Sequence, residues 1–195
     1  MGTLIGLIGF SIVSSVTPGP NNVLLLASGS TFGFRRTAPH ILGTAVGIGV
    51  MAVAVGAGLG LLIASRPAVG VAMRVVGSAY LLYLAVSIAR SGAFREARVA
   101  RPLGVAQAAA FQLINPKVWV FALGAMSTFR PMELPIAFGT GVVAFTMMAV
   151  VIPTAALWAA GGGAFARVLR GGRWSKPVSV ALAVLVAATV ISVWI

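Results

Sequence analysis

The sequence of 195 residues predicts an all-α integral membrane protein with six transmembrane helices. Hydrophobic residues make up 59% of the chain and charged residues only 8%, whereas soluble domains carry roughly 25% charged residues. The mean hydropathy of +1.06 is too high for a chain that must cover its own core with polar side chains. These values exclude an ordinary water-soluble enzyme and a disordered chain.

Six long apolar segments account for almost the whole sequence, and each approaches or exceeds the roughly 20 residues that a helix needs to cross a bilayer. Only short loops remain between them, so residues 1–195 are expected to form a single transmembrane domain. The first segment follows no basic region and contains no small-residue cleavage site, which argues against a removable signal peptide. The segments are 3–29, 40–64, 68–89, 103–129, 134–160 and 177–195.

The basic residues are distributed unevenly, and their distribution predicts the orientation of the chain. The formal net charge is +12, from 14 basic and 2 acidic residues. Basic loops face the cytoplasm, so loops one, three and five are expected there and both termini in the periplasm. The aromatic residues do not interleave with these charges, so we expect no nucleic-acid partner. The basic residues of the three loops are Arg35, Arg36, Arg90, Arg95, Arg98, Arg101, Arg167, Arg170, Arg173 and Lys176.

Two further basic residues fall inside apolar segments. Arg74 lies a turn or two inside the third segment, where its side chain could either reach the interface or line a pathway. Lys117 lies roughly 20 Å along the fourth segment, at mid-membrane depth. A charge there costs at least about 3 kcal/mol, so Lys117 is expected to be functional or internally paired.

The first and fourth segments are each interrupted by proline. Pro18 and Pro20 both lack an amide hydrogen, so a continuous helix is not expected there. Thr17 before Pro18, and Asn115 before Pro116, match an N-cap followed by proline at the first helical position. Paired broken segments are a sequence indicator of a transporter binding site, with simple proline kinks as the alternative.

The two halves of the chain carry related features. Residues 30–32 and 127–129 both read Ser-Thr-Phe, each following one of the breaks. Three spans in each half would place the second half upside down in the membrane. The sequence therefore predicts two inverted three-helix repeats, about 1–92 and 93–195.

Three motifs together resemble the LysE/RhtB family of amino-acid exporters over essentially the whole chain. They are Thr17-Pro18-Gly19-Pro20-Asn21, Gly77-x-x-Tyr80-Leu-x-Tyr83-Leu84 and Asn115-Pro116-Lys117. The resemblance implies a multi-pass protein of the bacterial inner membrane that exports amino acids or related metabolites, by secondary transport driven by the proton gradient. Family members often carry Asp where this chain has Asn21.

A zwitterionic amino acid suggests a role for each part of the expected site. Its carboxylate suits Lys117 and a restarted helix, and its ammonium group suits carbonyls freed near Ser14 and Val16, side-chain oxygens, or tyrosine faces. The two tyrosines could equally belong to an interfacial belt. The expected binding residues are Thr17, Pro18, Gly19, Pro20, Asn21, Asn22, Tyr80, Tyr83, Gln112, Asn115, Pro116 and Lys117, with Arg74 as an additional charge.

The absence of interior acidic residues favours a neutral substrate. Glu96 and Glu133 lie at loops or segment ends. His40 also lies at a segment end, and histidine is the only side chain that ordinarily titrates near neutral pH. The alternatives are an exporter of another solute or cation, and an integral-membrane enzyme. The chain has no cysteine, which excludes thiolate metal ligands. A hard cation requires oxygen ligands, usually carboxylates, and none lies at mid-membrane depth. We therefore expect no metal site, no cofactor and no enzymatic activity. The expected partners are a small-molecule substrate and the lipid bilayer, and a homo-oligomer is compatible with the sequence.

Overall fold

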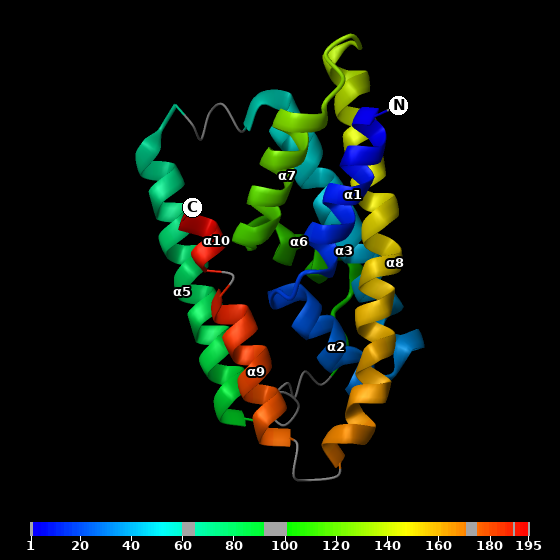
Figure 1. Cartoon of the computed structure of the whole chain (residues 1–195), viewed down its shortest axis with the longest axis vertical. Coiled ribbons are helices and arrows are strands. Elements are labelled where there is room, and N and C mark those ends of the chain that lie inside the picture. The colour runs from blue at the N-terminus through cyan, green and yellow to red at the C-terminus, as the bar shows by residue number, and fades with distance from the viewer. Residues whose placement is uncertain (1, 60–64, 92–100, 171–174, 189, 195) are drawn as a thin grey trace.

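The computed structural model describes residues 2–59, 65–91, 101–170, 175–188 and 190–194, which form helices joined by short irregular segments and contain no strand (Figure 1). The helical segments follow the six apolar segments, with the first and fourth each divided in two. They are α1 (Gly2–Val16), α2 (Pro20–Phe32), α3 (Phe34–Ala54), a π-helical turn η1 (Val55–Leu59), α5 (Pro67–Ser91), α6 (Val105–Ile114), α7 (Pro116–Phe129), α8 (Ile136–Arg170), α9 (Ser175–Ala188) and α10 (Ile191–Trp194).

Within the described part of the chain, two helical stretches are long and apolar enough to cross a membrane by themselves, Phe34–Leu59 and Ile136–Ala164. A third span results if α1 and α2 are taken together, since these two helices meet at a bend of 62°. The apolar, all-helical architecture fits a membrane protein. The count of six spans stays a prediction.

Helix ends that adjoin the basic loops gather in one half of the molecule. The ends of α2, α5 and α8 and the beginnings of α3 and α9 all lie in the lower half of Figure 1, whereas the N-terminus lies at its top. Arg35 and Arg36, in the first turn of α3, are exposed in this half. The arrangement agrees with loops one, three and five facing the same side.

The first break is confirmed, but its helix restarts two residues later than predicted. Thr17 is not an N-cap, because its amide and hydroxyl both donate to the Val13 carbonyl and extend the last turn of α1. The N-cap of α2 is Gly19, an extended residue with φ −168° and ψ 174°, and Pro20 holds the first helical position. Residues before proline avoid helical angles, which explains why Gly19 separates the two helices.

The second break is confirmed as predicted. Asn115 is extended, with φ −82° and ψ 110°, and its side chain accepts a hydrogen bond from the Lys117 amide at 3.2 Å. Pro116 then begins α7. Both helices therefore restart at a proline in the interior of the bundle.

Glycines allow the helices around these breaks to approach closely. A Cβ added to Gly43 would lie 2.3 Å from the Val105 carbonyl oxygen, and one added to Gly47 would lie 2.6 Å from that of Ala109. The Gly43/Gly47 pair thus holds α3 against α6, the ordinary packing role of such spacing in membranes. Gly29 of α2 approaches α8 more closely still, since an added Cβ would lie 1.9 Å from the Ala159 carbonyl oxygen.

Two apolar clusters fill the interior, and the outer faces of the helices are apolar as well. The larger cluster joins α1, α3, α7 and α8, and the smaller one joins α2 to the α5–α9 pair through Leu26, Leu81 and Val186. Side chains such as Ile5, Phe145 and many others remain exposed outside these clusters. This extensive exposed apolar surface fits contact with lipid rather than water.

We predict that Gly29→Ala destabilises the protein, because the new Cβ would lie 1.9 Å from the Ala159 carbonyl oxygen and force α2 away from α8. Overpacking of this kind costs about 1–3 kcal/mol, which thermal unfolding in detergent measures. Gly163→Ala in α8 is the matched control, since its Cβ meets nothing within 4 Å. Equal melting temperatures for the two variants would contradict the close α2–α8 contact.

Candidate functional site

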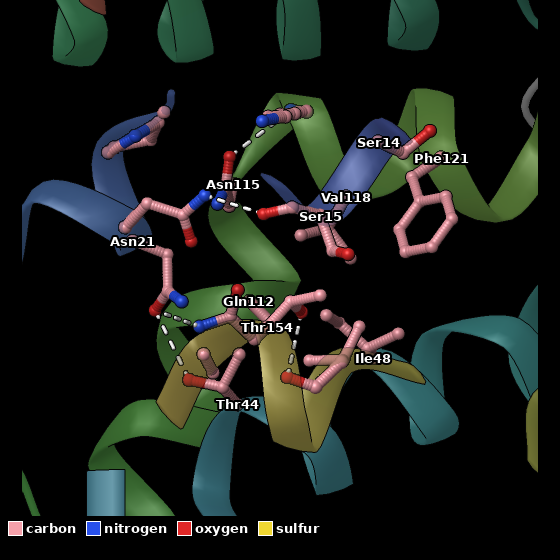
Figure 2. Close-up of a pocket in the computed structure, with 16 residues that line it drawn as sticks. Ser14, Ser15, Asn21, Thr44, Ile48, Gln112, Asn115, Val118, Phe121 and Thr154 are labelled. Carbon is pink, nitrogen blue, oxygen red and sulfur yellow. Dashed lines mark hydrogen bonds between the residues drawn. The ribbon is translucent and has the colours of Figure 1, made fainter. Parts of the chain in front are cut away.

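The two helix breaks face one another across a polar pocket, with about 420 Å³ of empty space that includes its opening (Figure 2). Six helices contribute to the walls, so residues far apart in sequence converge there. The lining residues are Ser14, Ser15, Gly19, Pro20, Asn21, Asn22, Thr44, Ile48, Gln112, Asn115, Lys117, Val118, Phe121, Val151, Thr154 and Ala155.

Asn21, directly after the first break, is the hydrogen-bonding centre of the pocket floor. Its Oδ1 atom accepts from Gln112 Nε2 at 2.9 Å and lies 3.3 Å from the Thr44 hydroxyl, as Figure 2 shows. His40 Nε2 lies 3.2 Å from the same oxygen. An amide oxygen only accepts, so this contact assigns the histidine hydrogen to Nε2. Asn21 thereby links α2, α3 and α6.

Two buried acceptor atoms of this cluster have no partner among the described residues. They are His40 Nδ1 and Gln112 Oε1, on side chains that are 1% and 0% exposed. Buried polar atoms are almost always hydrogen-bonded, so orphaned ones indicate a strained or functional position. Both residues contact the same oxygen of Asn21, so their two unpartnered hydrogen-bond acceptors lie beside the pocket.

Lys117 crosses from the second break to the first. Its Nζ atom donates to the Thr17 carbonyl at 2.5 Å and lies 3.5 Å from the Pro18 carbonyl. The aliphatic stem passes over Gly19, where an added Cβ would lie 3.0 Å from Cδ. The ammonium is therefore internally paired, and it has a third hydrogen for another acceptor.

The carbonyl end of α1 carries acceptors that the prolines leave open. A helix would bond the Ser14 carbonyl to the amide of residue 18 and the Val16 carbonyl to that of residue 20, and both positions are proline. The side chain of Asn22 donates to the Ser15 carbonyl at 2.7 Å and to the Thr17 carbonyl at 3.0 Å. Only part of this helix end is thereby satisfied.

The two restarted helices differ in how their first amides are used. The Asn115 side chain already binds the Lys117 amide at the start of α7. Gly19 offers α2 no side-chain cap. The amides of Asn21 and Asn22 therefore form the more open of the two positive helix ends.

Several predicted site residues lie outside the pocket. Pro116 is buried and packs on α5, where an added Cβ at Gly77 would lie 2.7 Å from its ring. Tyr83 is 69% exposed and Arg74 is exposed, because the face that α5 buries toward α9 is the one that carries Leu81 and Ala85. The structure therefore does not bring Tyr83 or Arg74 to the pocket. The Tyr80 side chain lies outside the described side chains.

Sequence reasoning missed the walls that α3, α8 and the interior of α7 contribute. Thr44 and Thr154 are isolated hydroxyls on apolar helices, and both also bond to carbonyls of their own helix. Phe121, Val151 and their apolar neighbours carry no sequence signal that separates pocket from core. The contacts of Thr44 and His40 with Asn21 identify α3 as part of the site.

The lining offers hydrogen-bond donors, acceptors and one ammonium group. The described residues contain no group of three His, Cys, Asp or Glu side chains that could hold a metal ion. The pocket lining therefore offers a positive group and hydrogen-bonding oxygens to a small polar molecule.

Comparisons with known proteins agree with this architecture. Curated proteins named cysteine/O-acetylserine efflux protein, from Escherichia coli strain K12 and from Shigella sonnei strain Ss046, are each 29% identical to this chain over 178 residues. Those alignments cover 90% of this chain and 89% of each relative. No solved structure matches the chain. The profile of the LysE type translocator family matches residues 12–193, so the chain belongs to that family of membrane transporters.

Proposed function

We propose that this protein exports a neutral amino acid, or a derivative with free carboxylate and ammonium groups, across the bacterial inner membrane in exchange for protons. The observation that carries the proposal is the pocket between the two helix breaks, where Lys117 meets the open end of α1. Membership of the translocator family and the printed names of the relatives support amino-acid-type export.

The substrate carboxylate is assigned to Lys117 and the start of α2. The ammonium of Lys117 lies beside Gly19, the uncapped position before α2. A carboxylate between them would receive charge-assisted hydrogen bonds from the Nζ atom and from first-turn amides. This arrangement is the membrane counterpart of anion binding at a broken helix.

The substrate ammonium is assigned to the carbonyl end of α1. Ser14 lines the pocket, and its carbonyl lacks the usual helical donor because residue 18 is proline. Helix ends that expose carbonyls attract cations through the helix dipole. The side chains of Ser15 and Thr154 supply further oxygens nearby.

The charge of the lining favours a neutral side chain on the substrate. Lys117 is the one charged residue among those that line the pocket. A second positive charge within 4–6 Å would be repelled by about 3 to 4 kcal/mol at an effective dielectric near 20. Cysteine and O-acetylserine, which the names of the relatives mention, both have neutral side chains.

Proton coupling is assigned to His40. It is buried in α3, its Nδ1 atom has no partner in the part of the chain that the structure describes, and its Nε2 atom contacts Asn21 on the pocket floor. Protonation of Nδ1 would place an imidazolium beside an amide that also holds Gln112. His40 contacts the uncharged side chain of Asn21, which lines the pocket, so a proton there would perturb the pocket directly.

The orientation and the repeat are part of the proposal. Gly6 of α1 packs on Phe129, and Phe10 packs on Gly124, so α1 and α7 run antiparallel. The Ser-Thr-Phe tripeptides close α2 and α7. These features support six spans in two inverted halves, about 1–92 and 93–195. The basic loop side would face the cytoplasm and both termini the periplasm.

The first test concerns Lys117. Lys117→Met should reduce the affinity for a neutral amino acid about 10- to 100-fold in inverted vesicles, because a charge-assisted hydrogen bond is lost. The wild-type protein should prefer the amino acid over its carboxamide, and the variant should lose this preference. A purely structural role would lower both activities equally.

The control for this test is Lys176→Met, which removes an exposed charge at the start of α9. It should retain transport and the preference for the free carboxylate. Undiminished selectivity in a well-folded Lys117→Met protein would refute the carboxylate assignment. Strong competition by lysine or arginine would refute the neutral substrate.

The second test concerns His40. His40→Gln keeps a polar side chain but removes the titrating group, so uptake driven by an acidic vesicle interior should fall at least about tenfold. Exchange of labelled for unlabelled substrate, which needs no net proton movement, should persist and serves as the internal control. Unchanged proton-driven uptake in this variant would exclude His40 as the coupling residue.

A further inference from the structure

A second depression lies at the opposite end of α3 and α6 from the second helix break. It contains about 720 Å³ of empty space, including its opening, and is wider than the pocket at the breaks. Two stretches meet there, the α2–α3 junction and the segment that leads into α6. The lining residues are Phe32, Arg35, Arg36, Pro39, Arg101, Pro102, Leu103 and Gly104. This set is called the basic groove below.

Three arginines give the groove a strong positive charge. Arg35, Arg36 and Arg101 are all exposed. Among the described residues none of them forms an ion pair, and the only described acidic residue, Glu133, lies beyond the far end of α7. Three guanidinium groups surround one depression, without a described carboxylate. Guanidinium groups suit an anion that accepts two parallel hydrogen bonds from each of them, such as a phosphate.

The backbone adds to this field. α3 begins at Phe34, and its N-cap, Gly33, makes no side-chain hydrogen bond to the first turn. α6 begins at Val105, directly after Gly104. Two helix N-termini therefore point their partial positive charges toward the same depression. The groove thus combines side-chain charge from two distant stretches with two helix dipoles.

The remaining walls are apolar, which distinguishes the groove from a site for a free ion. Phe32, Pro39, Pro102 and Leu103 stand beside the arginines. This combination matches the boundary between a lipid headgroup and its acyl chains. The groove also lies at the α2–α3 junction, next to the helix ends that adjoin the basic loops.

We propose that the basic groove binds the phosphate of an anionic glycerophospholipid, with its acyl chains lying against the apolar wall. The lipid would join α3 to α6, the two helices that supply Thr44 and Gln112 to the transport pocket. The proposal does not depend on the identity of the exported substrate, because no residue is shared between groove and pocket.

The test measures lipid retention by the purified full-length protein in detergent, using native mass spectrometry with added phosphatidylglycerol or phosphatidylcholine. Wild-type protein should retain phosphatidylglycerol in preference to phosphatidylcholine. The triple variant Arg35→Gln, Arg36→Gln, Arg101→Gln should lose this preference, with about fivefold weaker binding for each charge removed. Correct insertion is checked by the elution volume and melting temperature of the variant.

The control is a triple variant with the same charge change elsewhere, Arg66→Gln, Arg130→Gln, Lys176→Gln. It should retain phosphatidylglycerol as the wild-type protein does. Equal loss in both triple variants would show a general charge effect and overturn the proposal. Displacement of the lipid by millimolar inorganic phosphate would overturn the lipid assignment in favour of a site for the free anion.

Discussion

The missing amide hydrogens of three prolines determine the architecture of the site. Pro18 and Pro20 leave two carbonyls of α1 without helical donors, and Pro116 interrupts the fourth apolar segment between α6 and α7. Open backbone inside a membrane is tolerated only where other protein groups or a polar cavity receive it. Lys117 fulfils this requirement by donating to the Thr17 carbonyl, which joins the two breaks through a contact between the halves of the chain.

The same constraint explains why the polar groups form one connected cluster. Asn22 satisfies part of the open end of α1, while Asn21 binds Gln112 and contacts His40. In surroundings of low dielectric such bonds strengthen one another, and any atom left over is costly. Two of the unpartnered atoms, His40 Nδ1 and Gln112 Oε1, belong to this cluster beside the pocket. A site that must exchange one ligand for another would keep such unsatisfied groups within reach.

Sequence patterns located both breaks and the charge at their centre, because proline and buried lysine act through local chemistry. They placed the restart of α2 at Pro18, since Thr17 resembles an N-cap and the bond from Thr17 back to Val13 is not visible in a pattern. The sequence patterns also grouped Tyr83 with the site. Helix packing decides which face α5 presents to α9, and the observed packing leaves this tyrosine exposed. Thr44 was missed for the same reason, because its contact with Asn21 spans two helices.

The pairing of Lys117 gives the proposed selectivity a physical basis. The ammonium group of Lys117 is hydrogen-bonded at the carbonyl end of α1 even in the empty pocket. A zwitterion can exchange these partners, because its carboxylate takes over Lys117 while its own ammonium replaces the lysine at the carbonyls. The net charge of the pocket then stays at that of Lys117 alone throughout the exchange. A substrate with a second positive charge would raise this net charge, since no carboxylate lines the pocket to receive it.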